Sequence, residues 1–129
     1  MNDIILIKAF CNDNYLSLNR DMIKLLGLNI TGFFSELCNE YKYYEANNML
    51  TEEGEFYSTT ENIKNNIGLS REQQDTCIKK LTELKIIEIK VKGLPPKRYF
   101  KINIQVLLNL LESNKSICVN PANRIVENS

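Results

Sequence analysis

The stretch that decides the fold is Gly68-Leu69-Ser70-Arg71-Glu72-Gln73-Gln74. Gly68 follows the apolar positions Ile63 and Ile67, and a glycine there allows the positive φ angle at which a helix ends. Ser70 and Gln73 have the S-x-x-Q spacing of a capping box, so a new helix is expected to begin at once. Two helices joined by so short a capped turn are typical of a helix-turn-helix.

Both helices of this unit can be delimited from the sequence. Ser58-Thr59-Thr60-Glu61 predicts a capping box of Ser58 and Glu61 at the start of the first helix. The second helix is expected from Ser70 to Lys85, with apolar residues at the spacing of one buried face. Its expected inward positions are Gln74, Cys77, Ile78, Leu81 and Leu84. Its expected outward positions are Arg71, Glu72, Asp75, Thr76, Lys79 and Lys80, with Gln73 partly outward.

A β-hairpin is expected directly after the second helix. From Ile86 to Lys92, apolar and charged residues alternate, which is the period of a strand with one buried face. Gly93-Leu94-Pro95-Pro96 predicts a turn, because proline cannot donate to a ladder. Lys97–Asn103 is expected to return as a second strand with Phe100 and Ile102 inward. A basic hairpin after a helix-turn-helix is a wing, so the sequence predicts a winged helix.

The segment before this unit is expected to add a strand and helices. Asp3 to Phe10 is expected to form a short strand, and Asn19 to cap a short helix that Gly27 ends. A longer helix is expected from Asn29, because apolar residues recur there with the spacing of one buried face. These residues are Ile30, Phe33, Phe34, Leu37, Cys38, Tyr41 and Tyr44.

The predicted fold class is α+β and mainly α: a winged helix-turn-helix with a C-terminal hairpin wing and an extra N-terminal strand and helix. Glu55 to Tyr57 is expected to be a strand fragment, and Val106 to Leu111 a short apolar helix. Residues 113–129 have little periodicity and are rich in Asn and Ser, which predicts a flexible tail or linker. The expected division is therefore a winged-helix domain over residues 1–112 and a tail over residues 113–129.

Composition limits the class of protein. A chain of 129 residues, 43% apolar and 25% charged, fits one globular domain with a single core. Its first apolar run, Ile4 to Ile7, lacks the cleavage pattern of a secretory signal. Its apolar stretches are shorter than the roughly 18–20 residues needed to span a bilayer. We therefore expect a soluble, cytoplasmic protein without membrane contact.

The titratable side chains do not predict a catalytic or metal centre. The four cysteines, at positions 11, 38, 77 and 118, are separated by 27, 39 and 41 residues, whereas metal ligands cluster in close pairs. The sequence has no histidine to complete such a site or to serve in neutral-pH acid–base chemistry. Phosphate-binding and dinucleotide-binding glycine motifs are also absent from the sequence. We expect a protein that is not an enzyme and needs no cofactor or metal.

Charge is distributed unevenly along the chain, although its total is zero. Residues 1–60 hold 4 basic and 9 acidic side chains, and residues 61–129 hold 12 basic and 7 acidic ones. Lys85 to Lys101 carries six basic residues against the single acid Glu88. A neutral total does not oppose a polyanionic partner, because phosphate attraction depends on the local patch.

These features predict that the protein binds double-stranded DNA. In a winged helix the N-terminal turns of the second helix enter the major groove, where side chains reach base edges. The groove contacts are expected from Arg71 to guanine, Gln73 to adenine and Thr76 to phosphate or a thymine methyl group. Phosphate contacts are expected from Ser70, Lys79, Lys80, Lys90, Lys92, Lys97 and Arg98. Glu72 and Asp75 are also expected to face the groove. They would either accept hydrogen bonds from cytosine amino groups or, as the alternative, show that this helix docks on protein instead of DNA.

The sequence also resembles the N-terminal winged-helix domain of phage and plasmid replication initiators, or replisome organisers, which are similar to DnaD-type primosomal proteins. The resemblance covers roughly residues 20–110. The residues that carry it are Tyr41-Lys42-Tyr43-Tyr44, Phe56-Tyr57, Gly68-Leu69-Ser70-Arg71, Gln73-Gln74, Leu81-x-x-Leu84-x-Ile86-Ile87 and Lys92-Gly93-Leu94-Pro95-Pro96-Lys97-Arg98-Tyr99-Phe100. It implies origin DNA binding in replication initiation, often as a homodimer, with a further domain that contacts the replicative helicase or its loader.

Two other functions fit the same sequence. One is a protein-interaction or dimerisation module that uses the acidic, aromatic first part of the chain. Its expected surface comprises Glu36, Glu40, Tyr41, Tyr43, Tyr44 and Glu45. The other is a transcriptional repressor, which uses the same fold and cannot be separated from an initiator by sequence.

Overall fold

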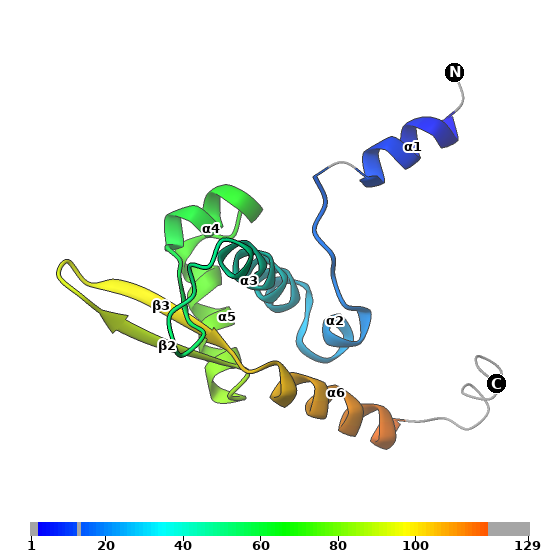
Figure 1. Cartoon of the computed structure of the whole chain (residues 1–129). Coiled ribbons are helices and arrows are strands. Elements are labelled where there is room, and N and C mark those ends of the chain that lie inside the picture. Colours follow the sequence, from blue (N-terminus) through cyan, green and yellow to red (C-terminus); the bar gives the residue numbers. More distant parts are fainter. Residues whose placement is uncertain (1–2, 13, 119–129) are drawn as a thin grey trace.

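The computed structural model describes residues 3–12 and 14–118 and is a mainly helical α+β winged helix (Figure 1). Its elements are α1 (Asp3–Asn12), α2 (Arg20–Leu26), α3 (Leu28–Ala46), β1 (Phe56–Tyr57), α4 (Thr60–Ile67), α5 (Arg71–Glu83), β2 (Ile87–Lys92), β3 (Lys97–Ile102) and α6 (Ile104–Cys118). Helix α3 contacts α2, α4, α5 and β1, so it is the centre of the packing. The hairpin β2–β3 projects from this body as the wing (Figure 1). The predicted fold class is confirmed.

The N-terminal segment differs from its prediction, because Asp3–Asn12 is the helix α1 and not a strand. The three strands of the sheet lie in the order β1-β3-β2, and the N-terminal segment joins none of them. An unpaired strand would leave its backbone N–H and C=O groups without partners, whereas a helix bonds them internally. The consecutive apolar residues Ile4 to Ile7 have no alternation, and such a run does not distinguish a strand from a helix.

The predictions for α2 and α3 are confirmed. The Asn19 side chain accepts a hydrogen bond from the Met22 amide at 2.8 Å, and Gly27 ends α2 with a φ of 96°. Most of the apolar stripe of α3 faces the core, as its spacing predicts. Phe33, Phe34 and Leu37 are buried, and Ile30, Cys38, Tyr41 and Tyr44 pack partly buried against them.

The turn between α4 and α5 has the predicted geometry. Gly68 adopts the left-handed conformation with a φ of 80°, which is strained for a residue with a Cβ. The Ser70 hydroxyl accepts from the Gln73 amide at 3.1 Å, and the Gln73 side-chain oxygen accepts from the Ser70 amide at 2.8 Å. The capping box that starts α5 is therefore confirmed.

The cap of α4 lies one residue later than predicted. The Thr59 hydroxyl accepts from the Asn62 amide at 3.0 Å, so Thr59 is the N-cap instead of Ser58. Ser58 is buried, and its amide donates to the Arg98 carbonyl at 3.2 Å. The chain thus continues to pair with β3 through Ser58, and the helix begins only after that contact.

A buried glutamine holds the helix-turn-helix together. The Gln74 side-chain amide donates to the carbonyl of Thr60, at the start of α4, and to that of Leu69, in the turn, both at 3.0 Å. Burying an amide is favourable only when it is hydrogen-bonded, and these two acceptors supply the bonds. The predicted inward positions are confirmed: Gln74, Cys77 and Leu81 are buried, and Ile78 and Leu84 are partly buried.

The sheet joins the wing to the core through aromatic residues. Phe100 on β3 lies opposite Phe56 on β1 and Ile89 on β2. The Phe100 ring centroid lies 6.0 Å from that of Phe56 and 6.3 Å from that of Phe33 on α3. The predicted burial of one strand face holds only near the core, since Val91 is 67% exposed. The part of the hairpin near its turn extends away from the body of the domain, so its side chains stay exposed.

Helix α6 is longer than the predicted segment from Val106 to Leu111. It begins at Ile104 and ends at Cys118, so residues 113–118 are helical and not a flexible tail. Leu107 and Leu111 are buried against the body and hold the helix there. Residues 119–129, the rest of the predicted tail, lie outside the described residues.

Two helices at the edge of the body expose apolar side chains. On α1 the residues Ile4, Ile5, Leu6, Ile7 and Phe10 are between 50% and 81% exposed. On α6 the residues Ile104, Val106 and Leu108 are exposed. Contiguous exposed apolar surface is typical of protein contact sites. In the part of the chain that the structure describes, no helix combines the length and the apolar character needed to cross a membrane.

Candidate nucleic-acid interface

The outward face of α5 carries the predicted groove residues. Ser70 is half-buried at the cap, and the other predicted residues on this helix are exposed. They are Arg71, Gln73, Thr76, Lys79 and Lys80. The Ser70 hydroxyl already serves the capping box, so its structural role is established by its hydrogen bond. Because α5 has its capped N-terminus at the surface, its first turns are free to approach a groove.

The predicted base-contacting residues divide between two flanks of α5. Gln73 and Thr76 border a surface hollow of about 420 Å³ that is also lined by the α2–α3 turn, including Gly27 and Leu28. The Thr76 hydroxyl donates to the Glu72 carbonyl at 3.1 Å, which leaves its methyl group and its oxygen lone pairs for a ligand. The Gln73 side-chain oxygen accepts a hydrogen bond in the capping box, so only the NH₂ group of Gln73 is available to a base.

Arg71 and Asp75 lie on the other flank, toward the wing. Burial lowers the pKa of the Arg98 guanidinium, the charges of Asp75 and Glu40 oppose that shift, and the charge of Arg71 adds to it. The charge of Asp75 therefore favours the charged form of Arg98, and the charge of Arg71 opposes it.

Arg98 makes more contacts with the rest of the domain than the sequence predicts. Its Nε–H donates to the Ser58 carbonyl at 3.3 Å, and its guanidinium lies over the Phe100 ring at 4.6 Å from the centroid. Its Nη2 is buried without a hydrogen-bond partner among the described residues. A half-buried guanidinium with these contacts has a packing role where β3 meets the Ser58 segment, so Arg98 is a weaker candidate for a phosphate contact.

Lys90 and Lys92 converge on one carboxylate. The Glu55 side chain is only 2% exposed, and its oxygens lie 3.2 Å from the Lys90 Nζ and 2.5 Å from the Lys92 Nζ. The hydrogen bond from Lys92 is the largest cause that lowers the pKa of Glu55, and Lys90 adds to it. The two lysines are 53% and 41% exposed, so they still reach solvent, but their positive charge is partly balanced.

Lys97 differs from the other wing lysines. It is exposed at the start of β3, and its Nζ lies over the Tyr57 ring at 5.3 Å from the centroid. Within the described residues, no carboxylate lies within ion-pair distance of Lys97. It is therefore the wing lysine whose charge is most available to a phosphate.

Several important residues were not singled out from the sequence as parts of a site. Glu55 lies in a turn-rich acidic segment, and its pairing with wing lysines 35 and 37 positions away leaves no local pattern. Tyr57 and Tyr99 lie opposite each other in the register of β1 and β3, with ring centroids 6.1 Å apart. The alternation of Tyr57 with Phe56 and of Tyr99 with Phe100 is the signal that would have placed both tyrosines on the outer face.

The predicted acidic interaction surface is partly wrong, because Glu36 and Glu40 are buried. The Asn66 amide donates to Glu36 at 2.8 Å, and the Asn62 amide donates to Glu40 at 3.3 Å, so these carboxylates join α3 to α4. Burial is the main cause that raises the pKa of Glu40 to about 7. Of the other residues in that surface, Tyr41 and Tyr44 pack on the core, whereas Tyr43 and Glu45 are exposed.

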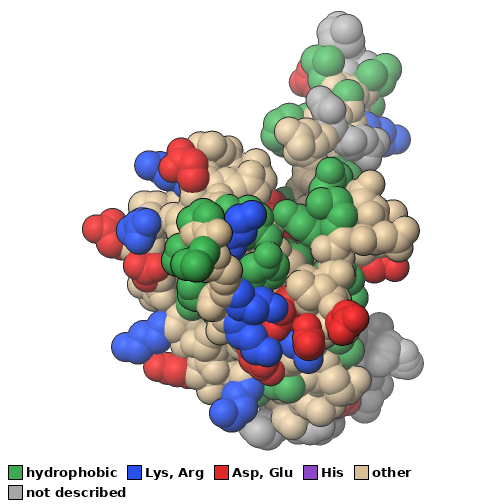
Figure 2. All heavy atoms as spheres, turned by 60° about the vertical axis from the view of Figure 1, so that its left-hand side comes forward, with side chains coloured by type: hydrophobic (Ala, Val, Ile, Leu, Met, Phe, Trp, Pro, Cys, Tyr) green, Lys and Arg blue, Asp and Glu red, His purple; other side chains and the backbone are tan. Residues whose placement is uncertain are grey.

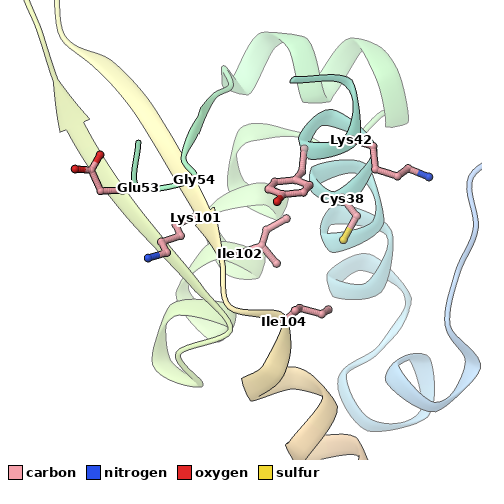
Figure 3. Close-up of a pocket in the computed structure, with 8 residues that line it drawn as sticks. Cys38, Lys42, Glu53, Gly54, Lys101, Ile102 and Ile104 are labelled. Carbon is pink, nitrogen blue, oxygen red and sulfur yellow. The ribbon is translucent and has the colours of Figure 1, made fainter. Parts of the chain in front are cut away.

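Cys38 and Cys77 are protonated structural residues. Burial raises the pKa of the Cys38 and Cys77 thiols to about 11. A thiol with so high a pKa is neither a nucleophile nor a metal ligand at neutral pH. Cys38 borders a cleft of about 420 Å³ between α3 and β3, in which Ile102 and Ile104 face the helix (Figure 3). The charged ends of Lys42 and Lys101 point away from this space (Figure 3), so it is mainly apolar.

Comparison with known proteins supports the fold. A search of protein-family profiles finds none that matches the chain, and a search of curated proteins finds none that is similar in sequence. Among solved structures, the chain is similar to one described as the "N-Terminal domain of DNA binding protein", with a TM-score of 0.59. The similarity covers 89% of this chain and 95% of that one, at 12% sequence identity. At this identity the similarity concerns the arrangement of the elements and not particular side chains.

Proposed function

We propose that this chain is a sequence-selective double-stranded DNA-binding domain, with α5 as the recognition helix and β2–β3 as the wing. The observation that carries the proposal is that the capped N-terminal turns of α5 are exposed beside a basic hairpin that projects from the same side of the core. This is the arrangement in which a helix enters a major groove while a neighbouring element contacts the backbone. The similar solved structure is described as part of a DNA-binding protein, which supports the same function.

The side chains of α5 divide into two roles. Arg71 donates two hydrogen bonds to guanine, and Gln73 and Thr76 contact adenine and a thymine methyl group from the other flank. Lys79 and Lys80 lie further along the helix and bind phosphates without sequence choice. Asp75, one helical turn after Arg71, limits how closely this flank approaches a phosphate and favours base contacts there.

The wing supplies affinity through the flanking backbone. Lys97 makes the main phosphate contact, and Lys90 and Lys92 contribute less because Glu55 balances part of their charge. Arg98 ties β3 to the Ser58 segment and Ser70 caps the recognition helix; each is a secondary contact to DNA. The domain binds DNA and catalyses no reaction in this proposal.

The finer role we propose is replication initiation on phage or plasmid DNA in a bacterial cytoplasm. Its support is the resemblance of the helix-turn-helix and wing sequences to replication initiators. In this role the chain binds origin DNA as a homodimer, and the replicative helicase or its loader is recruited to the same complex. A repressor would use the same DNA contacts but would need no helicase or loader.

A salt titration on duplex DNA tests the proposal. Each neutralised phosphate contributes about −0.9 to the slope of log K against log salt, so four or so contacts give a slope of about −3 to −4. Binding of a labelled duplex, followed by fluorescence anisotropy at several salt concentrations, measures this slope. Absence of binding at low salt to a long mixed-sequence duplex, or a slope near zero, would contradict the proposal.

A protein-interaction module remains the second candidate, and the exposed apolar side chains of α1 favour it. The apolar cleft between α3 and β3 and the hollow beside α6 offer surfaces of matching character. The test is the substitution of Ile5 and Phe10 by Ser in one variant, followed by analytical ultracentrifugation. A shift of the wild-type dimer to monomer would support dimerisation through α1, and a wild-type monomer would contradict it.

A further inference from the structure

Four tyrosines form a strip from the wing to the end of α3. Tyr57 and Tyr99 pair across β1 and β3, and the rings of Tyr43 and Tyr44 on α3 lie 5.7 Å apart. Tyr43, Tyr44 and Tyr57 line one cleft, which joins the two pairs. The strip therefore spans three elements, α3, β1 and β3, which lie far apart in the sequence.

The wing half of the strip lies on the outer face of the sheet. Phe56 and Phe100 point into the core, so their neighbours Tyr57 and Tyr99 point to the opposite face. Two ammonium groups lie over these rings: the Lys92 Nζ at 4.8 Å from the centroid of Tyr99 and the Lys97 Nζ at 5.3 Å from that of Tyr57. Figure 2 shows the side of the molecule that carries the wing, where green side chains, a class that includes tyrosine, lie beside the blue basic ones.

The α3 half of the strip opens into a cleft of about 340 Å³ between α3, β1 and α4. Tyr43, Tyr44 and Tyr57 form its aromatic side, and Asn39 and Asn62 offer amides with both donors and acceptors. The carboxylates of Glu36 and Glu40 also line it and are nearly completely buried. A phosphate is repelled by two carboxylates, whereas a planar base can stack on tyrosine and hydrogen-bond with amides and carboxylates.

We propose that the tyrosine strip binds single-stranded DNA, with bases stacked on Tyr57 and Tyr99 and one base inserted into the cleft. Lys97 moves from the Tyr57 ring to a phosphate of the bound strand, and Lys92 does the same by exchanging the Glu55 carboxylate for a phosphate, which leaves Glu55 paired with Lys90. An unpaired strand is required because the faces of duplex bases are covered by their neighbours. This activity goes beyond the duplex binding of α5, since the bases contact the tyrosine strip and only the wing lysines serve both forms of DNA.

The experiment compares two single strands of about twelve nucleotides, an adenine oligonucleotide and an abasic one with the same number of phosphates. Because one stacked base contributes about 1–3 kcal/mol, the wild-type protein should bind the adenine strand about tenfold more tightly or better. Anisotropy of a labelled strand gives the affinity. The chain has no tryptophan and six tyrosines, so quenching of the intrinsic tyrosine fluorescence reports stacking directly.

The double variant Tyr57→Thr with Tyr99→Thr should lose this preference, since threonine suits a strand but offers no ring. Tyr15→Thr is the matched control, because Tyr15 is 66% exposed and lies outside the strip, and it should retain the preference. Arg71→Ala on α5 should weaken binding to duplex only. If the double variant fails to fold, Asn39→Ala with Tyr43→Ala, both exposed on α3, should weaken the adenine complex several-fold.

Three results would overturn the proposal. The first is equal wild-type affinity for the adenine and abasic strands. The second is an unchanged preference in a folded variant that lacks both Tyr57 and Tyr99. The third is an equal effect of Arg71→Ala on single-stranded and duplex DNA, which would assign both ligands to α5. Failure of duplex binding alone, with the preference for adenine intact, would contradict the function proposed for α5 and leave the strip supported.

Discussion

The recognition helix α5 and the wing both carry basic side chains, but they hold them in different ways. On α5 the exposed basic residues Arg71, Lys79 and Lys80 alternate with Glu72 and Asp75 along the same outward face. On the wing the balancing charge comes from outside the hairpin, because Glu55 lies before β1 and binds Lys90 and Lys92. The wing therefore has two balanced lysines on β2 and a free cation, Lys97, which lies opposite Lys92 beside the turn.

This difference predicts separate roles in DNA binding for α5 and for the wing. A face of mixed charge gains little from a general approach to phosphates, so α5 is suited to selecting bases through directional hydrogen bonds. A free lysine on a projecting hairpin gives affinity that is independent of sequence and sensitive to salt. The two regions should therefore respond differently to substitution, and four predictions test that difference.

The largest effect is expected from Leu81→Ala, which removes support shared by both regions. Leu81 is completely buried on the inner face of α5, in the same core that contains Ile86 and Ile87 at the start of the wing. The substitution should lower the free energy of unfolding by about 2–5 kcal/mol through lost burial and the cavity left behind. Urea unfolding followed by circular dichroism measures this. An unchanged unfolding midpoint would refute the packing of α5.

Arg71→Ala should come next and should act on sequence selectivity. A bidentate contact to guanine is worth about 1–3 kcal/mol of discrimination, so the preferred duplex should lose that amount. Nonspecific duplex should be bound nearly as well as before. Parallel titrations of a selected duplex and of its scrambled counterpart give both values. An equal loss on the two duplexes would make Arg71 a phosphate contact and remove the main difference between α5 and the wing.

The sequence was most informative where a structure depends on neighbours along the chain. The Ser70–Gln73 capping box and the left-handed Gly68 need only a few adjacent residues, and the inward stripe through Leu81 repeats within one helix. These were predicted correctly. The cap of α4 was placed at Ser58 instead of Thr59 because the pairing of Ser58 with Arg98 joins segments 40 residues apart.

The candidate site was harder to predict because charge and burial depend on tertiary contacts. Lys90 and Lys92 look equivalent to Lys97 in the sequence, and only the fold brings Glu55 to the first two. Glu36 and Glu40 look like exposed acidic residues on a helix, yet the amides of Asn66 and Asn62 allow them to be buried. The prediction of a strand for Asp3–Asn12 was wrong for the same reason. The apolar run Ile4 to Ile7 does not show whether the segment pairs with a sheet or forms a helix.

A third prediction concerns Glu40, the buried carboxyl group on α3 that accepts from Asn62 on α4. Burial raises its pKa from 4.5 to about 7, so between these values the folded protein holds a proton that the unfolded chain has released. The free energy of unfolding should therefore fall as the pH rises from about 4.5 to 7, and should not change further because of this group above pH 7. Glu40→Gln should reduce that decrease and stabilise the protein at pH 8.

Denaturant titrations at pH 5 and pH 8 measure this effect. The change should be smaller than that of Leu81→Ala, because the glutamine preserves the side-chain volume and an oxygen that accepts from Asn62. Glu45→Gln is a matched control on the same helix, since Glu45 is exposed. If both variants show the pH dependence of the wild type, the burial of Glu40 would not control stability. A change in both would point to the net charge of α3 instead.

The smallest effect is expected within the wing, from Lys92→Gln compared with Lys97→Gln. Removal of Lys97 should make the salt slope for duplex binding less negative by about 0.9, the value for one phosphate contact. Removal of Lys92 should change the slope by less, because Glu55 lies 2.5 Å from its Nζ and already balances that charge.

Glu55→Gln sharpens the comparison, since it frees Lys90 and Lys92 and should make the slope steeper. Equal changes for Lys92 and Lys97 would mean that the Glu55 pairs open when DNA binds, and the distinction between the paired and the unpaired lysines of the wing would then be lost.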